Sequence, residues 1–155
     1  MIKSLGVMLD QCLSFDSHAD AVVRACNYHM RAIKHVRNLM TQSTALTLAC
    51  SLINSRLDYC NALLNGAPAS TIRKLQRAQS NAACVVLGVD RYADWISVLR
   101  TLHWLPLRQR IVFKTAVLTL KTQKTKTPDY PKCHLIPRAT GRATCSATLP
   151  LLVIL

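Results

Sequence analysis

The sequence contains no glutamate, and acidic residues of any kind are scarce. Its 155 residues include 7 acidic ones, all of them aspartate, against 20 lysines and arginines, which gives a formal net charge of +13. Solubility alone requires a smaller excess, and a surface of one sign attracts partners of the other sign. The composition therefore predicts a polyanionic partner.

Long apolar runs are also missing. No stretch approaches the ~20 apolar residues that a membrane-spanning helix needs, and the first residues do not form the basic and then apolar region of a signal peptide. We therefore expect an intracellular protein, nuclear or cytoplasmic, without a membrane partner. Nucleic acid is the favoured polyanion, because the basic residues are spread along the whole chain.

The cysteines do not show the spacing pattern of a disulfide-bonded protein. The number of cysteines is odd, their spacing is irregular and most lie among apolar residues, which is typical of reduced thiols packed as small hydrophobic groups. The half-apolar composition argues against disorder, and the length allows one domain with a modest core. The cysteines are residues 12, 26, 50, 60, 84, 133 and 145.

Apolar residues recur at steps of three and four along most of the chain, which indicates helices. Asp16 or Ser17 can cap the first helix and Ser70 the third, which Gly88 ends. We predict a mainly α fold, a bundle of about four to five helices with one short N-terminal strand and an irregular C-terminal tail. The predicted helices run from Asp16 to Met40, Thr41 to Asn65, after Pro68 to Gly88, Ala93 to Leu102 and Leu107 to Gln123.

The alternation of Leu5, Val7 and Leu9 predicts the strand, with a turn near Asp10 and Gln11. Its partner would lie upstream, or the strand would be an edge remnant. The predicted organisation is a strand remnant in 1–15, a helical domain in 16–124 and a flexible tail in 125–155. The residues expected to form the core are Val22, Ile33, Leu52, Ile53, Leu75, Val86, Ile111 and Phe113.

Basic residues form rows on three of the predicted helices. Ordinary surface helices mix charges and gain ion pairs between neighbouring turns, whereas these rows repel themselves without an anion. We expect the rows to contact nucleic acid, and a merely solvated face is the alternative. The rows are Arg24, Arg31, Lys34 and Arg37, then Arg73, Lys74 and Arg77, and finally Arg110, Lys114 and Lys121.

No catalytic or metal site is expected. Two-metal phosphoryl transfer needs clustered carboxylates, but Asp10, Asp16 and Asp20 are better explained as a turn, a helix cap and a solvated charge. The pairs Cys26–His29 and Cys133–His134 lack the second half of a zinc pattern.

Neither a nucleophilic triad nor a stacking platform is predicted. A triad built from Cys60, His103 and an aspartate has no local signature. Trp95 and Trp104 could stack on bases, but both lie in apolar runs, so core packing is the preferred interpretation.

Four stretches resemble LINE-type, non-LTR retrotransposon reverse transcriptases of the jockey-like and related clades. They follow the family's order and approximate spacing from Leu5 to about Tyr130. The fourth is the most specific. The stretches are Leu5-Gly6-Val7 with Leu9, Asp10, Phe15, Asp16 and His18; Ser55 to Asn61 with Leu63, Leu64 and Gly66; Leu75 to Gln79 with Asn81, Ala82 and Ala83; and Leu102 to Pro106 with Arg108, Arg110, Ile111, Phe113 and Lys114.

The resemblance implies the thumb and connecting helices that follow the polymerase palm of a transposable element. In that family, RNA-directed DNA polymerase activity resides in a palm with paired aspartates that use magnesium, and this palm would lie upstream of Met1. We therefore expect a non-enzymatic fragment without its own cofactor, truncated at both ends, which holds template-primer RNA and DNA by phosphate contacts. The alternatives are a helical protein-interaction module and a decayed open reading frame without a selected function.

Overall fold

The computed structural model describes residues 2–125, 135–137 and 152–154. The chain divides into two compact units, Met1–Val112 and Phe113–Leu155. The boundary between them falls within the last long helix, α6 (Leu107–Thr125). The fold is mainly helical, as the sequence predicts.

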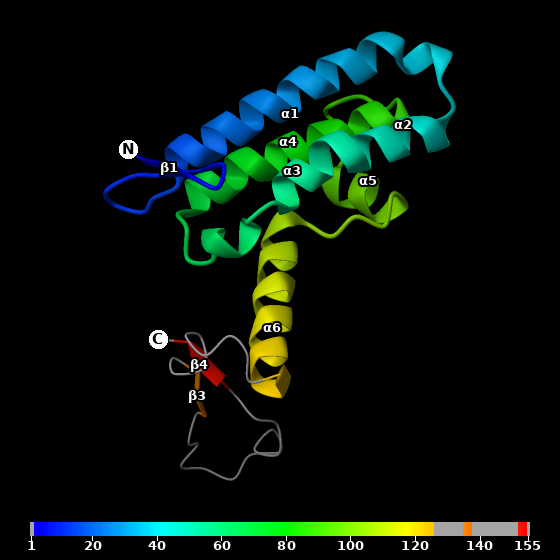
Figure 1. Cartoon of the computed structure of the whole chain (residues 1–155). Helices are drawn as coiled ribbons and strands as arrows, with labels where there is room; N and C mark the ends of the chain where they lie inside the picture. The colour runs from blue at the N-terminus through cyan, green and yellow to red at the C-terminus, as the bar shows by residue number, and fades with distance from the viewer. Residues whose placement is uncertain (1, 126–134, 138–151, 155) are drawn as a thin grey trace. The chain divides into compact units, whose positions relative to one another are not determined.

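The first unit is built around two long helices, α1 (Asp16–Val36) and α4 (Ala69–Leu87), which lie side by side with α2 packed against both (Figure 1). Apart from the start of α6, shorter helical segments make up the rest of the helical part of this unit. They are η1 (Arg37–Leu39), α2 (Gln42–Ala49), the π-helical turn η2 (Cys50–Asn54), α3 (Ser55–Asp58), η3 (Asn61–Leu64) and α5 (Trp95–Thr101).

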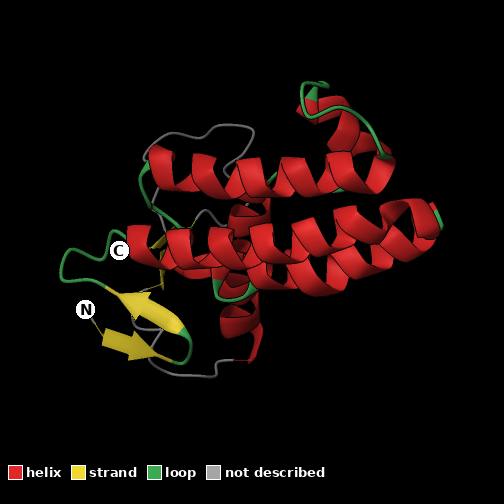
Figure 2. Ribbon diagram, turned by 90° about the horizontal axis from the view of Figure 1, so that it is seen from above, coloured by secondary structure: helices red, strands yellow, loops and turns green. Residues whose placement is uncertain are grey.

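The N-terminus forms a hairpin rather than the predicted single strand. Strand β1 (Ile2–Ser4) pairs antiparallel with β2 (Val7–Leu9), with Ile2 opposite Leu9. Leu5 and Gly6 between them have φ angles of 45° and 83°, as a type I′ turn requires. Figure 2 shows this hairpin beside the start of α1. The prediction was wrong because it counted turn residue Leu5 as part of the strand.

The predicted helix ends are partly wrong. Phe15 precedes α1 and Pro68 precedes α4, and neither helix has a side-chain cap, so Asp16, Ser17 and Ser70 do not cap them. Proline's fixed φ favours a helix start without such a bond. The predicted end at Gly88 is confirmed: Gly88 is left-handed, and the Val89 N–H donates to the Cys84 carbonyl at 3.1 Å.

The predicted helix from Thr41 to Asn65 is interrupted rather than continuous. It consists of α2, the π-helical turn, α3 and η3, and Cys60 has a φ of 52° between the last two. The apolar pattern is continuous across these breaks, so it gave no signal of them.

The core of the first unit lies between α1, α4 and the helices that cover them. Five of the eight residues expected there are buried, and Val22 and Leu52 pack partly buried against its edge. Phe113, which lies in the second unit, is 64% exposed, so its prediction as core was wrong. Helix α6 is apolar almost all round, and its sequence therefore does not indicate which side is buried.

The five buried residues are Ile33, Ile53, Leu75, Val86 and Ile111. On α1 the buried residues are His18, Ala19, Cys26 and Ile33, whereas Val36 near its end is exposed.

The described part of the second unit contains the end of α6 and a strand pair. Strand β3 (Leu135–Pro137) pairs antiparallel with β4 (Leu152–Ile154), with Leu135 opposite Ile154. The sequence did not predict this pairing within the irregular tail. The other residues of that tail, including Cys133 and His134, lie outside the described residues.

Candidate nucleic-acid interface

Two glutamines of α4 hold the start of α6, which belongs to the first unit. The Gln79 side chain is fully buried and donates to the Leu105 carbonyl at 2.9 Å. The Gln76 side-chain oxygen accepts from the Leu107 N–H at 2.8 Å, at the start of α6. Helix starts leave backbone N–H groups without partners, so Gln76 supplies the cap that Pro106 cannot. These bonds hold the Leu102–Pro106 loop against α4.

Arg110 of α6 is held by side chains from the interrupted helix. Its guanidinium donates to the Asn54 side-chain oxygen at 3.1 Å and forms an ion pair with Asp58, which also accepts from Asn61 at 3.2 Å. The Arg110 side chain is 18% exposed. This predicted phosphate contact therefore has partners within the chain.

Lys74 of α4 faces α1 rather than solvent alone. Its ammonium lies 3.0 Å from an Asp20 carboxylate oxygen and 3.8 Å from one of Asp16. The hydrogen bond to Asp20 raises the pKa of Lys74. Thus Lys74 also belongs to the basic residues with partners in the chain.

Arg37, at the end of α1, caps the C-terminus of α4. Its guanidinium donates to the carbonyls of Val85 at 3.1 Å and Val86 at 2.8 Å, and to that of Met40 at 3.1 Å. The last carbonyls of a helix lack partners within it and carry a partial negative charge, which a cation stabilises. Arg37 therefore joins α1 to α4.

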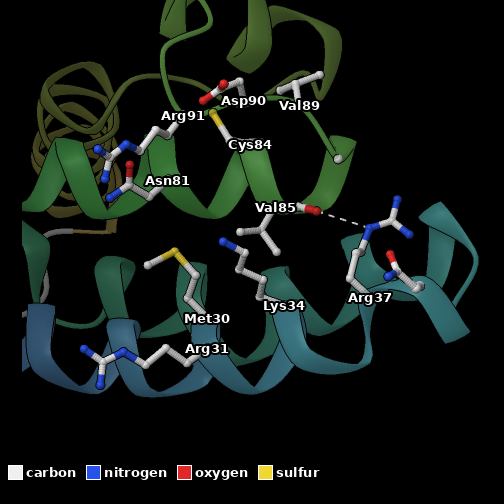
Figure 3. A pocket seen from close by; sticks show the side chains of 12 residues that line it. Met30, Arg31, Lys34, Arg37, Asn81, Cys84, Val85, Val89, Asp90 and Arg91 are labelled. Carbon is white, nitrogen blue, oxygen red and sulfur yellow. Dashed lines mark hydrogen bonds between the residues drawn. The ribbon is translucent and has the colours of Figure 1, made fainter.

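Other basic residues of α1 and α4 line two grooves. The first, called the α1–α4 groove, has a volume of about 570 Å³. Figure 3 shows Met30 and Lys34 extending from α1 toward α4, with Asn81 and Arg91 on the α4 side. The groove is lined by Met30, Arg31, Lys34, Arg37, Asn38, Asn81, Cys84, Val85, Gly88, Val89, Asp90 and Arg91.

The second, called the α4–α5 groove, has a volume of about 590 Å³. Arg73 and Arg77 lie one helical turn apart on the α4 side. The opposite side comes from the segment between α4 and α5. The groove is lined by Arg73, Gln76, Arg77, Ser80, Asn81, Arg91, Tyr92, Ala93 and Trp95.

Asn81 and Arg91 line both grooves, so the two form adjoining parts of one basic surface. We call the five cations Arg31, Lys34, Arg73, Arg77 and Arg91 the groove cations. All five are exposed, and none takes part in an ion pair within the described residues, where the paired cations are Lys74 and Arg110. Like charges gathered without carboxylate partners favour binding of an anion.

The aspartates explain why these cations lack partners. Each of the six between residues 2 and 125 accepts hydrogen bonds from groups other than the groove cations. Asp10 binds Ser14, Asp16 binds Thr71, Asp20 binds Lys74, Asp58 binds Arg110, Asp90 binds the Tyr92 N–H and Asp94 caps α5. Only Asp90 also lines a groove.

Three residues of this surface were missed or misjudged from the sequence. Arg91 and Tyr92 lie in the loop after Gly88, outside the predicted helical rows, although an arginine next to a tyrosine is a signal that could have found them. Trp95 is 41% exposed, so its prediction as core was wrong, whereas Trp104 packs partly buried against the core.

The other predicted contacts lie apart from the grooves. Arg24 is exposed on α1 but lines neither groove. Lys114 and Lys121 are exposed on the part of α6 that belongs to the second unit. The structure thus brings together two cations from each of the first two predicted rows and adds Arg91.

Sulfur and imidazole groups form no metal cluster in the part of the chain that is described: no three or more His, Cys or Asp side chains gather there. Cys26 and Cys84 are buried free thiols, and burial raises the pKa of Cys26 to about 11. Burial lowers the pKa of His18. Among the same residues, none of the helices has the length and apolar content needed to span a membrane.

No family model, curated protein or solved structure matches the chain.

Proposed function

We propose that this chain is the thumb and post-palm part of a LINE-type retrotransposon reverse transcriptase, which holds template-primer nucleic acid and carries no catalytic centre. One observation carries the nucleic-acid part of this proposal: the five groove cations lie on one surface without forming ion pairs, while the six aspartates between residues 2 and 125 bind other groups of the chain. The excess charge is therefore available to an external anion.

The mutual contacts of the four resembling stretches support the family origin. The Tyr59 hydroxyl of the second stretch donates to the Leu5 carbonyl of the first at 2.6 Å. Gln79 of the third donates to Leu105 of the fourth, whose Arg110 pairs with Asp58 of the second. Stretches that belong to one folded domain are expected to contact one another in this way.

The proposed mechanism is electrostatic positioning. Arginine and lysine neutralise backbone phosphates and release the counterions condensed on them, which gives affinity without reading the base sequence. The groove cations would fix the strand, while the paired aspartates of the family's palm would carry out the chemistry. The partner is RNA or DNA, and magnesium is a cofactor only of the intact polymerase.

The test is binding of the purified chain to single strands, duplex DNA and an RNA–DNA hybrid across a salt series. Five phosphate contacts predict that log K falls with log salt with a slope of about −3.5 for single strands. The variant Arg73→Gln/Arg77→Gln/Arg91→Gln should lower the magnitude of that slope by about 2.

The matched control is Arg24→Gln/Arg100→Gln/Arg108→Gln, which removes the same charge from exposed positions outside both grooves. It should leave the slope within about 0.7 of that of the unaltered chain, the contribution of one phosphate. Equal losses in both variants would show that net charge rather than the groove surface binds nucleic acid.

A protein-interaction module is the second candidate, favoured by exposed apolar side chains on α6. Phe113, Leu118 and Leu120 are 64%, 48% and 54% exposed. Apolar surface of this kind can recruit a partner helix. Capture of a partner that survives high salt and is lost in Phe113→Ser would favour this function. A chain without a cooperative melt would instead indicate a decayed reading frame.

A further inference from the structure

We propose that the α4–α5 groove binds an unpaired base, with its ring stacked on Trp95 or Tyr92 and its flanking phosphates on Arg73, Arg77 and Arg91. This inference rests on the proposed function and deepens it, because it makes single-stranded nucleic acid the preferred class of ligand. The observation behind it is the joint presence of two exposed aromatic rings and three arginines in one groove.

The tryptophan ring is presented from a fixed backbone position. Trp95 is the first residue of α5, directly after Asp94, whose carboxylate accepts from the Ile96 and Ser97 N–H groups at 3.3 and 3.1 Å. These bonds lower the pKa of Asp94 and keep the cap charged. A ring on an ordered helix start loses little conformational freedom when it binds a ligand.

The ring of Tyr92 is in contact with the guanidinium of Arg91. The Arg91 guanidinium lies 4.9 Å from the centre of the Tyr92 ring and donates to the Tyr92 hydroxyl at 2.7 Å. Arg91 also lines the α1–α4 groove. A nucleic-acid strand with a base stacked in the α4–α5 groove could therefore continue past Arg91 to phosphate contacts in the α1–α4 groove. Tyr92 remains 78% exposed.

The chemistry of the groove favours a base over other anionic ligands. An aromatic ring stacks on every base because each base has a π-face, and cations beside the ring engage the phosphates. In a duplex both faces of a base are already stacked, so only an unpaired base is available. The groove's volume of about 590 Å³ is in the range of sites for drug-sized ligands, which suits about one nucleotide.

The Gln76 side chain in the groove lining is not available to read base edges. The Gln76 side-chain oxygen is occupied by the Leu107 N–H, and its amide nitrogen donates to Gln79 at 3.0 Å. Stacking without edge recognition tolerates sequence. We therefore expect similar affinities for oligothymidine and oligoadenosine, with only the modest differences that stacking strength produces.

The first test compares an oligothymidine with a strand of equal length made of abasic nucleotides, which keeps the phosphates and lacks the bases. The oligothymidine should bind at least about fivefold more tightly, as one stacked base gives, and both should show the same salt slope. Equal affinities would overturn the stacking site and leave phosphate binding intact. Absence of binding by either strand at low salt would overturn the proposed function as well.

The second test assigns the effect to Trp95. The variant Trp95→Leu should weaken the preference for bases and Trp95→Leu with Tyr92→Leu should abolish it, whereas Trp95→Phe should keep most of it. The matched control is Ile96→Ala, because Ile96 is 42% exposed on the same helix, close to the 41% of Trp95, but does not line the groove. A preference that survives Trp95→Leu and Tyr92→Leu together would overturn the assignment.

Fluorescence provides a readout that a merely structural role of Trp95 would not change. In Trp104→Phe, Trp95 is the sole tryptophan, and stacking on a base should quench its emission. Oligothymidine should quench it, whereas the abasic strand should not. Equal quenching by both strands would contradict stacking.

Discussion

Arg110, at the junction between α6 and α3, differs in its partners from the groove cations, although all of them are arginine or lysine. Arg110 is 18% exposed and is held by Asn54 and Asp58. Arg73 and Arg77 are exposed beside a groove with no carboxylate in its lining. Residue type and helical spacing therefore do not distinguish a cation that stabilises the fold from one that can bind a ligand.

The comparison extends to Arg37 and Lys74. Both belong to predicted phosphate-binding rows, yet Arg37 caps α4 and Lys74 pairs with two aspartates of α1. Each bond replaces interactions with water, so the net stabilisation depends on burial and geometry. Four substitutions rank these contributions.

The largest expected effect is that of Arg110→Met. The variant removes bonds to two side chains, and Asp58 and Asn54 then lose their cation. Because Asp58 is 38% exposed and water can reach it, we expect a loss of about 2 kcal/mol, less than that for a fully buried pair. Urea unfolding measures it.

A double-mutant cycle with Asp58→Asn isolates the pair itself. The matched control, Lys114→Met, removes an exposed charge from the same helix one turn later. A loss below about 0.5 kcal/mol for Arg110→Met would place Arg110 with the groove cations, since surface substitutions usually fall in that range.

Arg37→Met should lower the free energy of unfolding by about 1 kcal/mol, because charged hydrogen bonds to the last carbonyls of α4 are lost. Thermal and urea melts measure this change. Lys34→Met, three residues earlier on the same helix, is the control for charge and length. If both variants melt alike, the cap at the end of α4 contributes nothing.

Lys74→Met should lower the free energy of unfolding only slightly. The side chains of Lys74, Asp16 and Asp20 are 44%, 48% and 51% exposed, and exposed ion pairs contribute little and are screened by salt. Melts at low and high salt measure both features. A loss of stability as large as that of Arg37→Met that persists in high salt would contradict this assignment.

The smallest expected effect on stability is that of Arg77→Met, near zero and within about 0.5 kcal/mol in either direction. Relief of repulsion from Arg73, one turn away, offsets the lost packing of the side-chain stem. The same variant should weaken nucleic-acid binding, so melts and binding together separate the two kinds of cation. A destabilised Arg77→Met variant would remove the distinction.

The sequence predicted some elements well and others poorly for identifiable reasons. Helices α1 and α4 follow from apolar residues at helical spacing, and the end of α4 follows from Gly88. The hairpin was missed because Leu5 continued the alternation into the turn. The predicted caps failed because Phe15 and Pro68 precede the two helices instead.

Part of the candidate site could be predicted from the sequence. Arg31, Lys34, Arg73 and Arg77 were found from rows on helices, because periodicity identifies an exposed face. Arg91, Tyr92 and Trp95 lie beyond the end of α4, where no period applies, and only folding brings them opposite α4.

By itself, the sequence determined the helical class, the excess of positive charge and the resemblance that suggests a retrotransposon origin. Only the tertiary structure decided which cations are left for a ligand. The physical reason is separation along the chain: Arg37 and Val85 are 48 residues apart, Arg110 and Asp58 are 52 apart and Lys74 and Asp20 are 54 apart. A helical period spans a few turns, whereas these contacts form only when distant helices pack together.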